Sequence, residues 1–148
     1  MASTTFLSNA TVNITQGATT YTKIGDNANQ VTLTVGQTAL ESTAFGDTGV
    51  RMVGGLQSVE CTIEFFLSYG GTGATAEVET ALADMVGKGS TTLIISPSGT
   101  TESASNPEYT ITNTMLESFT PINSTVGELA TVTATFTGGT WARDITSP

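Results

Sequence analysis

The chain has no histidine, a single cysteine and only four basic residues among its 148 amino acids. Histidine is the commonest general acid–base group of enzymes, so its absence removes the usual proton-transfer catalyst. Neither a Gly-x-Ser-x-Gly nor a Ser-x-x-Lys arrangement is present to supply an activated serine. The sequence therefore predicts a protein that is not an enzyme and has no catalytic residues.

Basic residues are scarce: the chain has thirteen acidic and four basic residues, which give a net charge of −9. A protein that grips a nucleic-acid duplex needs Lys and Arg to displace the counterions of the phosphates. The composition therefore excludes an ordinary nucleic-acid binder. The acidity has two interpretations: it aids solubility, or it forms a surface that repels a passing polyanion.

The other absences concern disulfides, membranes and metals. The lone Cys61 cannot form an intrachain disulfide, and its phase with Val59 and Ile63 predicts a small buried hydrophobe. No apolar run is long enough to span a membrane, and no signal peptide is expected at the N-terminus. Asp26 and Asp47 lack the regular oxygen-donor spacing of calcium loops. We therefore expect no membrane span, no metal and no cofactor.

Alternation of apolar and polar residues with a period of two is the main pattern that is present, and it is typical of half-buried β-strands. The longest example is residues 57–68, and shorter strands are expected at 11–16, 30–35, 91–96, 108–119 and 128–136. Gly36 is expected to end the 30–35 strand. A phase change within 108–119 predicts a β-bulge near Asn113. Residues 74–86 carry apolar residues at helical spacing and predict the only α-helix.

These elements predict a mainly β fold, an antiparallel β-sandwich or open barrel with six or seven strands, one flanking α-helix and a long inter-strand loop. Residues 10–137 are expected to form one domain, with an N-terminal arm at 1–9 and a C-terminal extension at 138–148. Trp141 in that extension has two interpretations. It either anchors to something outside the domain or folds back on the sheet edge.

The long loop is expected at residues 41–56, because four glycines within ten residues interrupt the alternation there. A loop of that length in a compact domain is usually functional or part of an interface. The loop also holds the acid Asp47 and the base Arg51.

The loop and two later stretches carry a resemblance to a known family. They are Ser42-Thr43-Ala44-Phe45-Gly46-Asp47 with Arg51 and Gly55-Leu56, then Asn106-Pro107-Glu108-Tyr109, and Val126-Gly127-Glu128-Leu129-Ala130 before a strand that ends at Gly138-Gly139. In their order and spacing these residues resemble the tail-tube proteins of long-tailed bacteriophages. Together with the N-terminal strand, the likeness spans most of the chain.

The resemblance implies a virion protein, assembled in the host cytoplasm, of which six copies form a ring. Rings stack into the tail tube, and DNA passes through the bore without specific binding. The implied partners are further copies of the chain and other tail proteins at the tube ends.

The resemblance also assigns two surfaces. Contacts between subunits or rings are expected at Glu41, Thr43, Phe45, Asp47, Arg51, Gly55 and Leu56. The lumen wall is expected at Thr32, Thr34, Glu60, Thr62, Glu64, Glu108, Thr131 and Thr133. Hydroxyl groups would hold water at such a wall, and carboxylates would keep DNA from adhering.

Three alternatives remain at this stage. The chain could be a capsid decoration protein or a head–tail connector on a related fold. It could also be a carbohydrate-binding or adhesion sandwich, for which Trp141 and three scattered tyrosines offer little support. Glu60 and Glu64 share one strand face, and we interpret them as solvated carboxylates rather than a catalytic pair because no base lies nearby in sequence.

Overall fold

The computed structural model describes residues 10–21, 23–97 and 102–146 of the chain. Within these residues there are eight β-strands, two short 3-10 helices and one α-helix, and the strands form a single antiparallel sheet. The predicted fold class, mainly β with one helix, is confirmed. The expected N-terminal arm, residues 1–9, lies outside the described residues.

The strands in chain order are β1 (Thr11–Gln16), β2 (Thr19–Tyr21), β3 (Ala28–Glu41), β4 (Met52–Phe66), β5 (Thr91–Ser96), β6 (Glu108–Phe119), β7 (Thr131–Thr137) and β8 (Thr140–Asp144). The helices are η1 (Gly25–Asn27), η2 (Gly73–Thr75) and α1 (Val78–Met85). The bounds of β1, β5 and β6 match the prediction.

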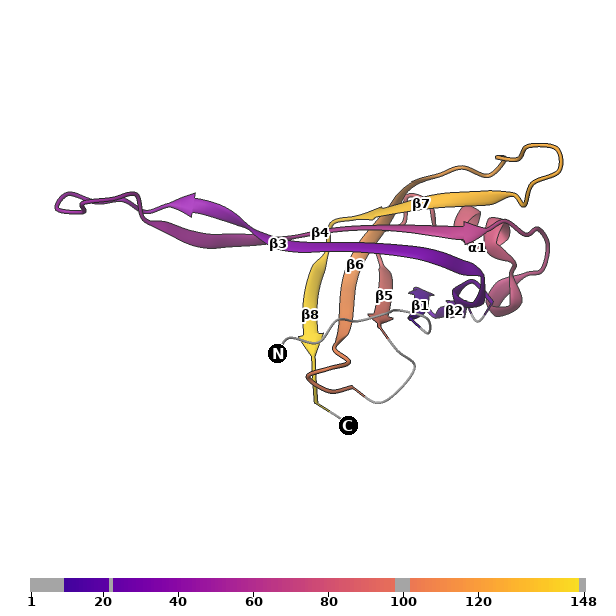
Figure 1. Ribbon diagram of the computed structural model, residues 1–148, viewed down its shortest axis with the longest axis horizontal. Coiled ribbons are helices and arrows are strands. Elements are labelled where there is room, and N and C mark those ends of the chain that lie inside the picture. Colours follow the sequence, from indigo (N-terminus) through magenta and orange to yellow (C-terminus); the bar gives the residue numbers. More distant parts are fainter. Residues whose placement is uncertain (1–9, 22, 98–101, 147–148) are drawn as a thin grey trace.

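Strand β6 divides the sheet into two halves. Its first part pairs with β5 and β8, and its second part pairs with β7. The path through the sheet is β2-β1-β5-β6-β7-β4-β3, with β8 beside β6. Figure 1 shows β3, β4 and β7 running crosswise to β5, β6 and β8. The sheet therefore folds over at β6 and encloses a core between its halves.

The core is one cluster of apolar side chains contributed by both halves of the sheet and by α1. Its largest fully buried members include Phe65, Phe136, Ile14 and Leu82. Cys61 is also fully buried, as predicted, and this burial raises the pKa of its thiol to about 12. The thiol is therefore a small core hydrophobe and not a reactive group.

The α-helix is shorter than expected, because a 3-10 turn occupies residues 73–75 where the prediction placed its first turn. The predicted apolar stripe is correct, since Val78, Ala81, Leu82 and Met85 are all buried. The helix ends before Gly87, whose φ of 80° is a left-handed conformation that glycine adopts without strain.

The bulge predicted near Asn113 is confirmed. Two residues of β6, Thr112 and Asn113, lie opposite the single residue Thr92 of β5, and Asn113 has a φ of 59°. The extra residue reverses which face the later side chains of β6 occupy. Ile111 and Thr114 are consequently both buried although they are three positions apart.

The prediction of a loop at residues 41–56 is wrong, because β3 continues to Glu41 and β4 begins at Met52. Gly36 lies within β3 and does not end the strand as expected. Only residues 42–51 connect the strands. The glycines at 54 and 55 lie within β4 and not in a turn. A Cβ at Gly55 would lie 3.0 Å from Leu40 Cδ1 and 3.1 Å from the Thr38 carbonyl oxygen, next to a register shift in the pair.

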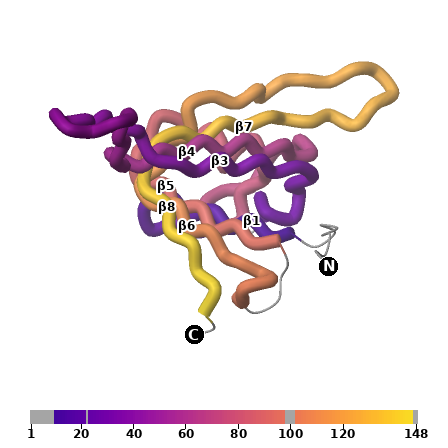
Figure 2. Tube along the Cα trace, turned by 60° about the vertical axis from the view of Figure 1, so that its left-hand side comes forward, coloured from indigo at the N-terminus to yellow at the C-terminus, as the bar shows by residue number. Residues whose placement is uncertain are grey.

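The two strands form a hairpin that projects from the body of the molecule (Figure 1). We call residues 37–56 the projecting hairpin. Figure 2 shows the same projection from another direction. The connecting residues 42–51 are its tip.

The segment expected as a C-terminal extension, residues 138–148, contains β8, which pairs with β6 from Glu108↔Asp144 to Thr112↔Thr140. Trp141 packs against the core, and its ring centroid lies 6.5 Å from that of Tyr109. Its Nε1 donates to the Gly36 carbonyl oxygen at 3.1 Å. Of the two interpretations of Trp141, the one in which it folds back on the sheet is correct.

Candidate assembly interface

The polar face of β3, β4 and β7 is the first candidate surface. We call it the threonine–glutamate face, and it consists of Thr32, Thr34, Glu60, Thr62, Glu64, Thr131, Thr133 and Thr135. Register aligns these residues in rows across the sheet. One row is Thr32–Thr62–Thr135, and the neighbouring row joins Thr34 to Glu60.

Seven of the eight residues expected at the lumen lie on this face, and Glu108 does not. Glu108 begins β6 in the other half of the sheet and pairs with Asp144 of β8. Burial and the neighbouring Glu102 carboxylate raise the pKa of Glu108. The expectation that Glu108 shares a face with Glu60 is wrong because β6 crosses from one half of the sheet to the other.

The threonine–glutamate face has no cationic side chain of its own, since β3, β4 and β7 contain neither Lys nor Arg. The residues that alternate with it along the same strands, such as Val59, Ile63 and Phe136, point to the opposite side and are buried in the core. In the single chain the face is open to solvent. A polyanion near it meets no cationic side chain of these strands.

Among the described residues, no cluster of three or more acidic, histidine or cysteine side chains is arranged to hold a metal. None of the helices in the described ranges is long and apolar enough to cross a membrane.

The tip of the projecting hairpin is the second candidate surface, and hydrogen bonds fix its shape. Ser42 N donates to the Arg51 carbonyl oxygen at 2.8 Å and Arg51 N donates to Thr43 Oγ1 at 3.0 Å, which closes the connection. Asp47 Oδ2 accepts from Ala44 N at 2.7 Å, and Asp47 N donates to the Ala44 carbonyl oxygen at 3.1 Å, which closes a turn over residues 44–47. Gly46, within this turn, has a φ of 95°.

Large apolar side chains are exposed to solvent along the projecting hairpin. The exposed ones are Leu40, Phe45, Val50, Met52, Val53 and Leu56, with Phe45 fully exposed. Of the seven residues predicted for inter-subunit contact, Glu41, Thr43, Phe45, Arg51 and Leu56 are exposed, and Asp47 and Gly55 are half-buried. An apolar protrusion of this kind marks an interaction site.

Two strands leave backbone groups unpaired at the ends of the β6-β7-β4-β3 half-sheet. In the described part of the chain β3 pairs only with β4, and the second part of β6 has β7 on one side and a single bridge, Val86↔Leu116, on the other. Beneath β3 lies an apolar groove of about 270 Å³, lined by Val31, Leu33 and Val35 together with β5 and β6 residues. In the described part of the chain, no strand pairs with the free edge of β3, and the groove is open to solvent.

The loop between β6 and β7, residues 120–130, is a third surface, at the end of the molecule opposite the hairpin tip (Figures 1 and 2). Its exposed apolar side chains are Ile122, Val126 and Leu129. Tyr69 Oη donates to the Pro121 carbonyl oxygen at 2.8 Å, and Asn123 Nδ2 donates to the Thr131 carbonyl oxygen at 3.3 Å. We call residues 120–130 the distal loop.

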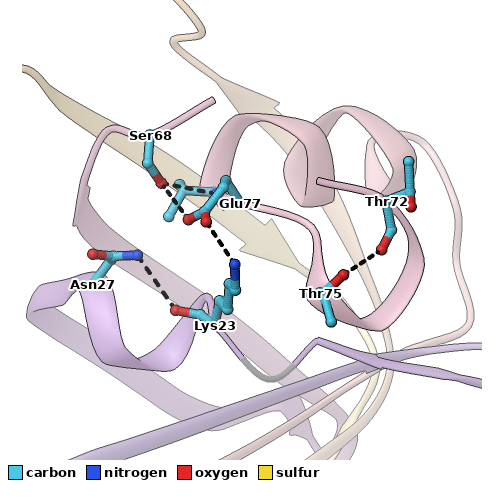
Figure 3. Close-up of polar contacts among 7 residues, drawn as sticks. Lys23, Asn27, Ser68, Thr72, Thr75 and Glu77 are labelled. Atoms are coloured by element: carbon cyan, nitrogen blue, oxygen red, sulfur yellow. Dashed lines mark hydrogen bonds and ion pairs between the residues drawn. The ribbon is translucent and has the colours of Figure 1, made fainter. Parts of the chain in front are cut away.

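A polar cluster holds the chain next to Tyr69 in place (Figure 3). Ser68 accepts hydrogen bonds from the first amides of α1, from Val78 N through Oγ and from Glu79 N through its carbonyl oxygen. Glu77 accepts from Lys23 Nζ at 2.8 Å and from Ser68 Oγ at 3.1 Å. These hydrogen bonds, with Lys23 first, lower the pKa of Glu77.

Two of these features differ from or go beyond the sequence pattern. The last strand is expected to begin at residue 128, but β7 begins at Thr131, so Leu129 lies in the distal loop and is exposed, as Ile122 and Val126 are. The hydrogen bond from Trp141 to Gly36 joins segments 105 residues apart, and no local pattern predicts it.

Comparison with known proteins links this arrangement to tail and injection tubes. No family model and no curated protein sequence matches the chain. Solved structures match over almost its whole length. The chain is similar to a protein of the SPP1 tail tube, with a TM-score of 0.67 and 8% identity over 95% of this chain and 78% of that one.

Two further similar structures are tube-end proteins. The sheath/tube terminator of the extracellular contractile injection system PVC gives a TM-score of 0.64 and 15% identity over 97% of this chain and 98% of that one. The tube-terminating cap of the anti-feeding prophage gives 0.61 and 13%, over 99% and 95%. At these identities the likeness establishes that the chain shares the fold of tube and tube-terminator proteins.

Proposed function

We propose that this protein is a structural subunit that assembles with copies of itself into stacked rings of six, forming the tube of a phage-type tail through which DNA passes. The observation that carries the proposal is the threonine–glutamate face. It is a broad, base-free, hydroxyl-rich surface on a sheet whose fold is that of tube proteins. An enzymatic role finds no support in similar structures, which are structural tube components.

Ring closure uses the two open edges of the half-sheet. A free strand edge is a template for pairing with another chain. The β3 edge of one copy therefore pairs with the second part of β6 in the next, and each copy continues its neighbour's sheet. The neighbour also covers the groove beneath β3, so that Val31, Leu33 and Val35 become fully buried. The burial of these side chains stabilises the ring.

The direction in which the ring curves decides which face of the sheet lines the bore. With the apolar face of β3, β4 and β7 turned to each subunit's own core, the threonine–glutamate face lines the hollow. Coulomb repulsion between carboxylates and phosphates is felt within about 10 Å at ordinary salt. Hydroxyls between the carboxylates keep a hydration layer. DNA moves along such a wall without a cationic site to stop it.

The projecting hairpin connects successive rings. It extends beyond the body of its own subunit, and its apolar side chains gain a partner only from another molecule. The other partners are proteins that end the tube. The assembled tube acts in the virion tail, and no membrane is among its partners.

Negative-stain electron microscopy of the purified protein at high concentration tests the proposal. We expect hollow tubes built of stacked rings. Single rings that never stack would instead indicate a terminator, the role named for two similar structures. A protein that stays monomeric at every concentration, or that decorates head shells, would exclude a tube subunit.

A further inference from the structure

The projecting hairpin and the distal loop are exposed apolar surfaces at opposite ends of one rigid sheet. In Figure 1 the hairpin tip lies at one end of the longest axis, and the loop between β6 and β7 lies at the other. Figure 2, from a different direction, also separates them widely. Neither surface can therefore cover the other within a single molecule, whereas two copies placed end to end bring them together.

Each surface exposes side chains that ordinarily lie in cores. Phe45 and Val126 are fully exposed, and Ile122 and Leu129 are about four-fifths exposed. Exposed patches of this kind mark interaction sites in stable proteins. In the distal loop, residues 123–125 separate Ile122 from Val126, and residues 127–128 separate Val126 from Leu129.

Hydrogen bonds constrain the conformation of both surfaces. The tip is closed by Ser42 N to the Arg51 carbonyl oxygen, and the distal loop is tied by Tyr69 to Pro121 and by Glu128 N to the Thr125 carbonyl oxygen at 3.0 Å. Each of these hydrogen bonds reduces the conformational freedom that association would otherwise have to remove.

Opposite charges are present on the two surfaces. Arg51 is the only basic residue of the projecting hairpin, which also holds the acids Glu41 and Asp47, and Glu128 is the only charged residue of the distal loop. The Arg51 side chain is 65% exposed, and its Nη1 lies 3.7 Å from Asp47 Oδ1, so this ion pair leaves most of the guanidinium open. Arg51 is therefore the one side chain of the projecting hairpin that offers Glu128 an opposite charge.

We propose that the hairpin tip of one copy docks on the distal loop of a copy in the adjacent ring, with Phe45 against Ile122, Val126 and Leu129 and with Arg51 facing Glu128. This inference rests on the proposed tube and names the receiving surface for the hairpin. The contact is heterologous, so it repeats without limit along one direction, as a tube requires.

Cysteine cross-linking tests the contact, since the native Cys61 is buried and does not compete. Thr48→Cys at the tip and Ser124→Cys in the distal loop leave the apolar side chains in place. A mixture of these two variants, oxidised under assembly conditions, is expected to give a disulfide-linked dimer. Thr48→Cys mixed with Ala142→Cys, an exposed position of β8, is the matched control and is expected to give at least tenfold less.

Charge exchange provides the second measurement. Arg51→Glu and Glu128→Arg are each expected to shorten or abolish tubes, and the double variant is expected to restore them. Arg143→Glu, an exposed base of β8, is the control and should leave tube length unchanged.

The failure of this contact and the failure of the tube proposal give different results. Wild-type tubes with no cross-link above the control, and no rescue by the double variant, would overturn the docking while leaving the tube in place. Absence of rings and tubes in the wild type would remove the tube itself. A cross-link together with rescue supports both.

Discussion

The indole Nε1 of Trp141 donates a hydrogen bond to the Gly36 carbonyl oxygen at 3.1 Å, which joins the last strand to the point where the projecting hairpin leaves the body. A second hydrogen bond, from Trp141 N to Gln57 Oε1 at 3.1 Å, reaches the other strand of the hairpin. One residue of β8 therefore fastens both strands at the root of the hairpin.

Replacing Trp141 by Phe keeps a ring at this place but removes the Nε1 donor. Because the Gly36 carbonyl is then left without that partner, we expect a loss of about 1 kcal/mol in unfolding free energy. Hydrogen exchange should accelerate for amides 36–41 and 52–57. Tyr69→Phe, which also removes one side-chain donor, is the control and should leave exchange in the hairpin unchanged. Equal effects of the two variants there would contradict the role of Trp141.

Reversing the charge of the threonine–glutamate face should make the bore retain DNA. In the double variant Glu60→Lys, Glu64→Lys each ring gains cations at the wall, and binding to phosphate rises with each one. We expect tubes that hold DNA fragments at low salt and release them at high salt, measured by co-sedimentation.

Asp84→Lys with Asp144→Lys makes the same charge change in α1 and β8 and is the matched control. If it retains DNA within the bore as strongly as the first variant, the threonine–glutamate face does not line the channel.

The thiol of Cys61 should be unreactive in the folded protein. Burial raises the pKa of the thiol to about 12, so almost no thiolate is present at neutral pH. We expect no labelling by a disulfide reagent at pH 8 until denaturant is added, and then labelling of one thiol per chain, followed by absorbance. Fast labelling without denaturant would mean that the core opens locally around β4.

The ion pair of Glu77 should make stability depend on pH in a defined direction. Its pKa is lowered in the folded state, so its contribution is present above the ordinary glutamate pKa and is lost as the pH falls through the lowered value. Lys23→Met should therefore reduce Tm at pH 7, and its deficit relative to wild type should shrink toward pH 3.

Lys88→Met is the control, because Lys88 forms no ion pair within the described residues and should show no such trend. A deficit for Lys23→Met that is constant from pH 7 to pH 3 would exclude the ion pair as its cause.

Gly138 and Gly139, between β7 and β8, offer a matched pair of substitutions. Both have positive φ, 79° and 91°, so alanine at either costs about 1–2 kcal/mol in backbone strain. Only at Gly139 would the new Cβ also lie 2.4 Å from the Thr112 carbonyl oxygen. We expect Gly139→Ala to lower the unfolding free energy clearly more than Gly138→Ala in urea titrations. Similar losses would mean that β6 can shift away at little cost.

The sequence alone determined the strand-rich fold, the core and the polar face, because side chains in a strand alternate strictly and one side must be buried. The placement of Val12 and Ile14 in the core, the burial of Cys61 and the bulge at Asn113 all follow from that period. The face shared by Thr32, Thr62 and Thr135 follows from the same period once the strands are in register.

Only the tertiary structure decided how far the hairpin extends, where Glu108 lies and what Trp141 contacts. Gly54 and Gly55 look like turn residues in sequence, yet they lie within β4, paired with β3 next to a register shift, and at Gly55 a Cβ would be in tight contact with Leu40. Glu108 does not lie on the threonine–glutamate face, because the first part of β6 belongs to the other half of the sheet. Such contacts join residues far apart in the chain, and local patterns contain no information about which distant strand will be the neighbour.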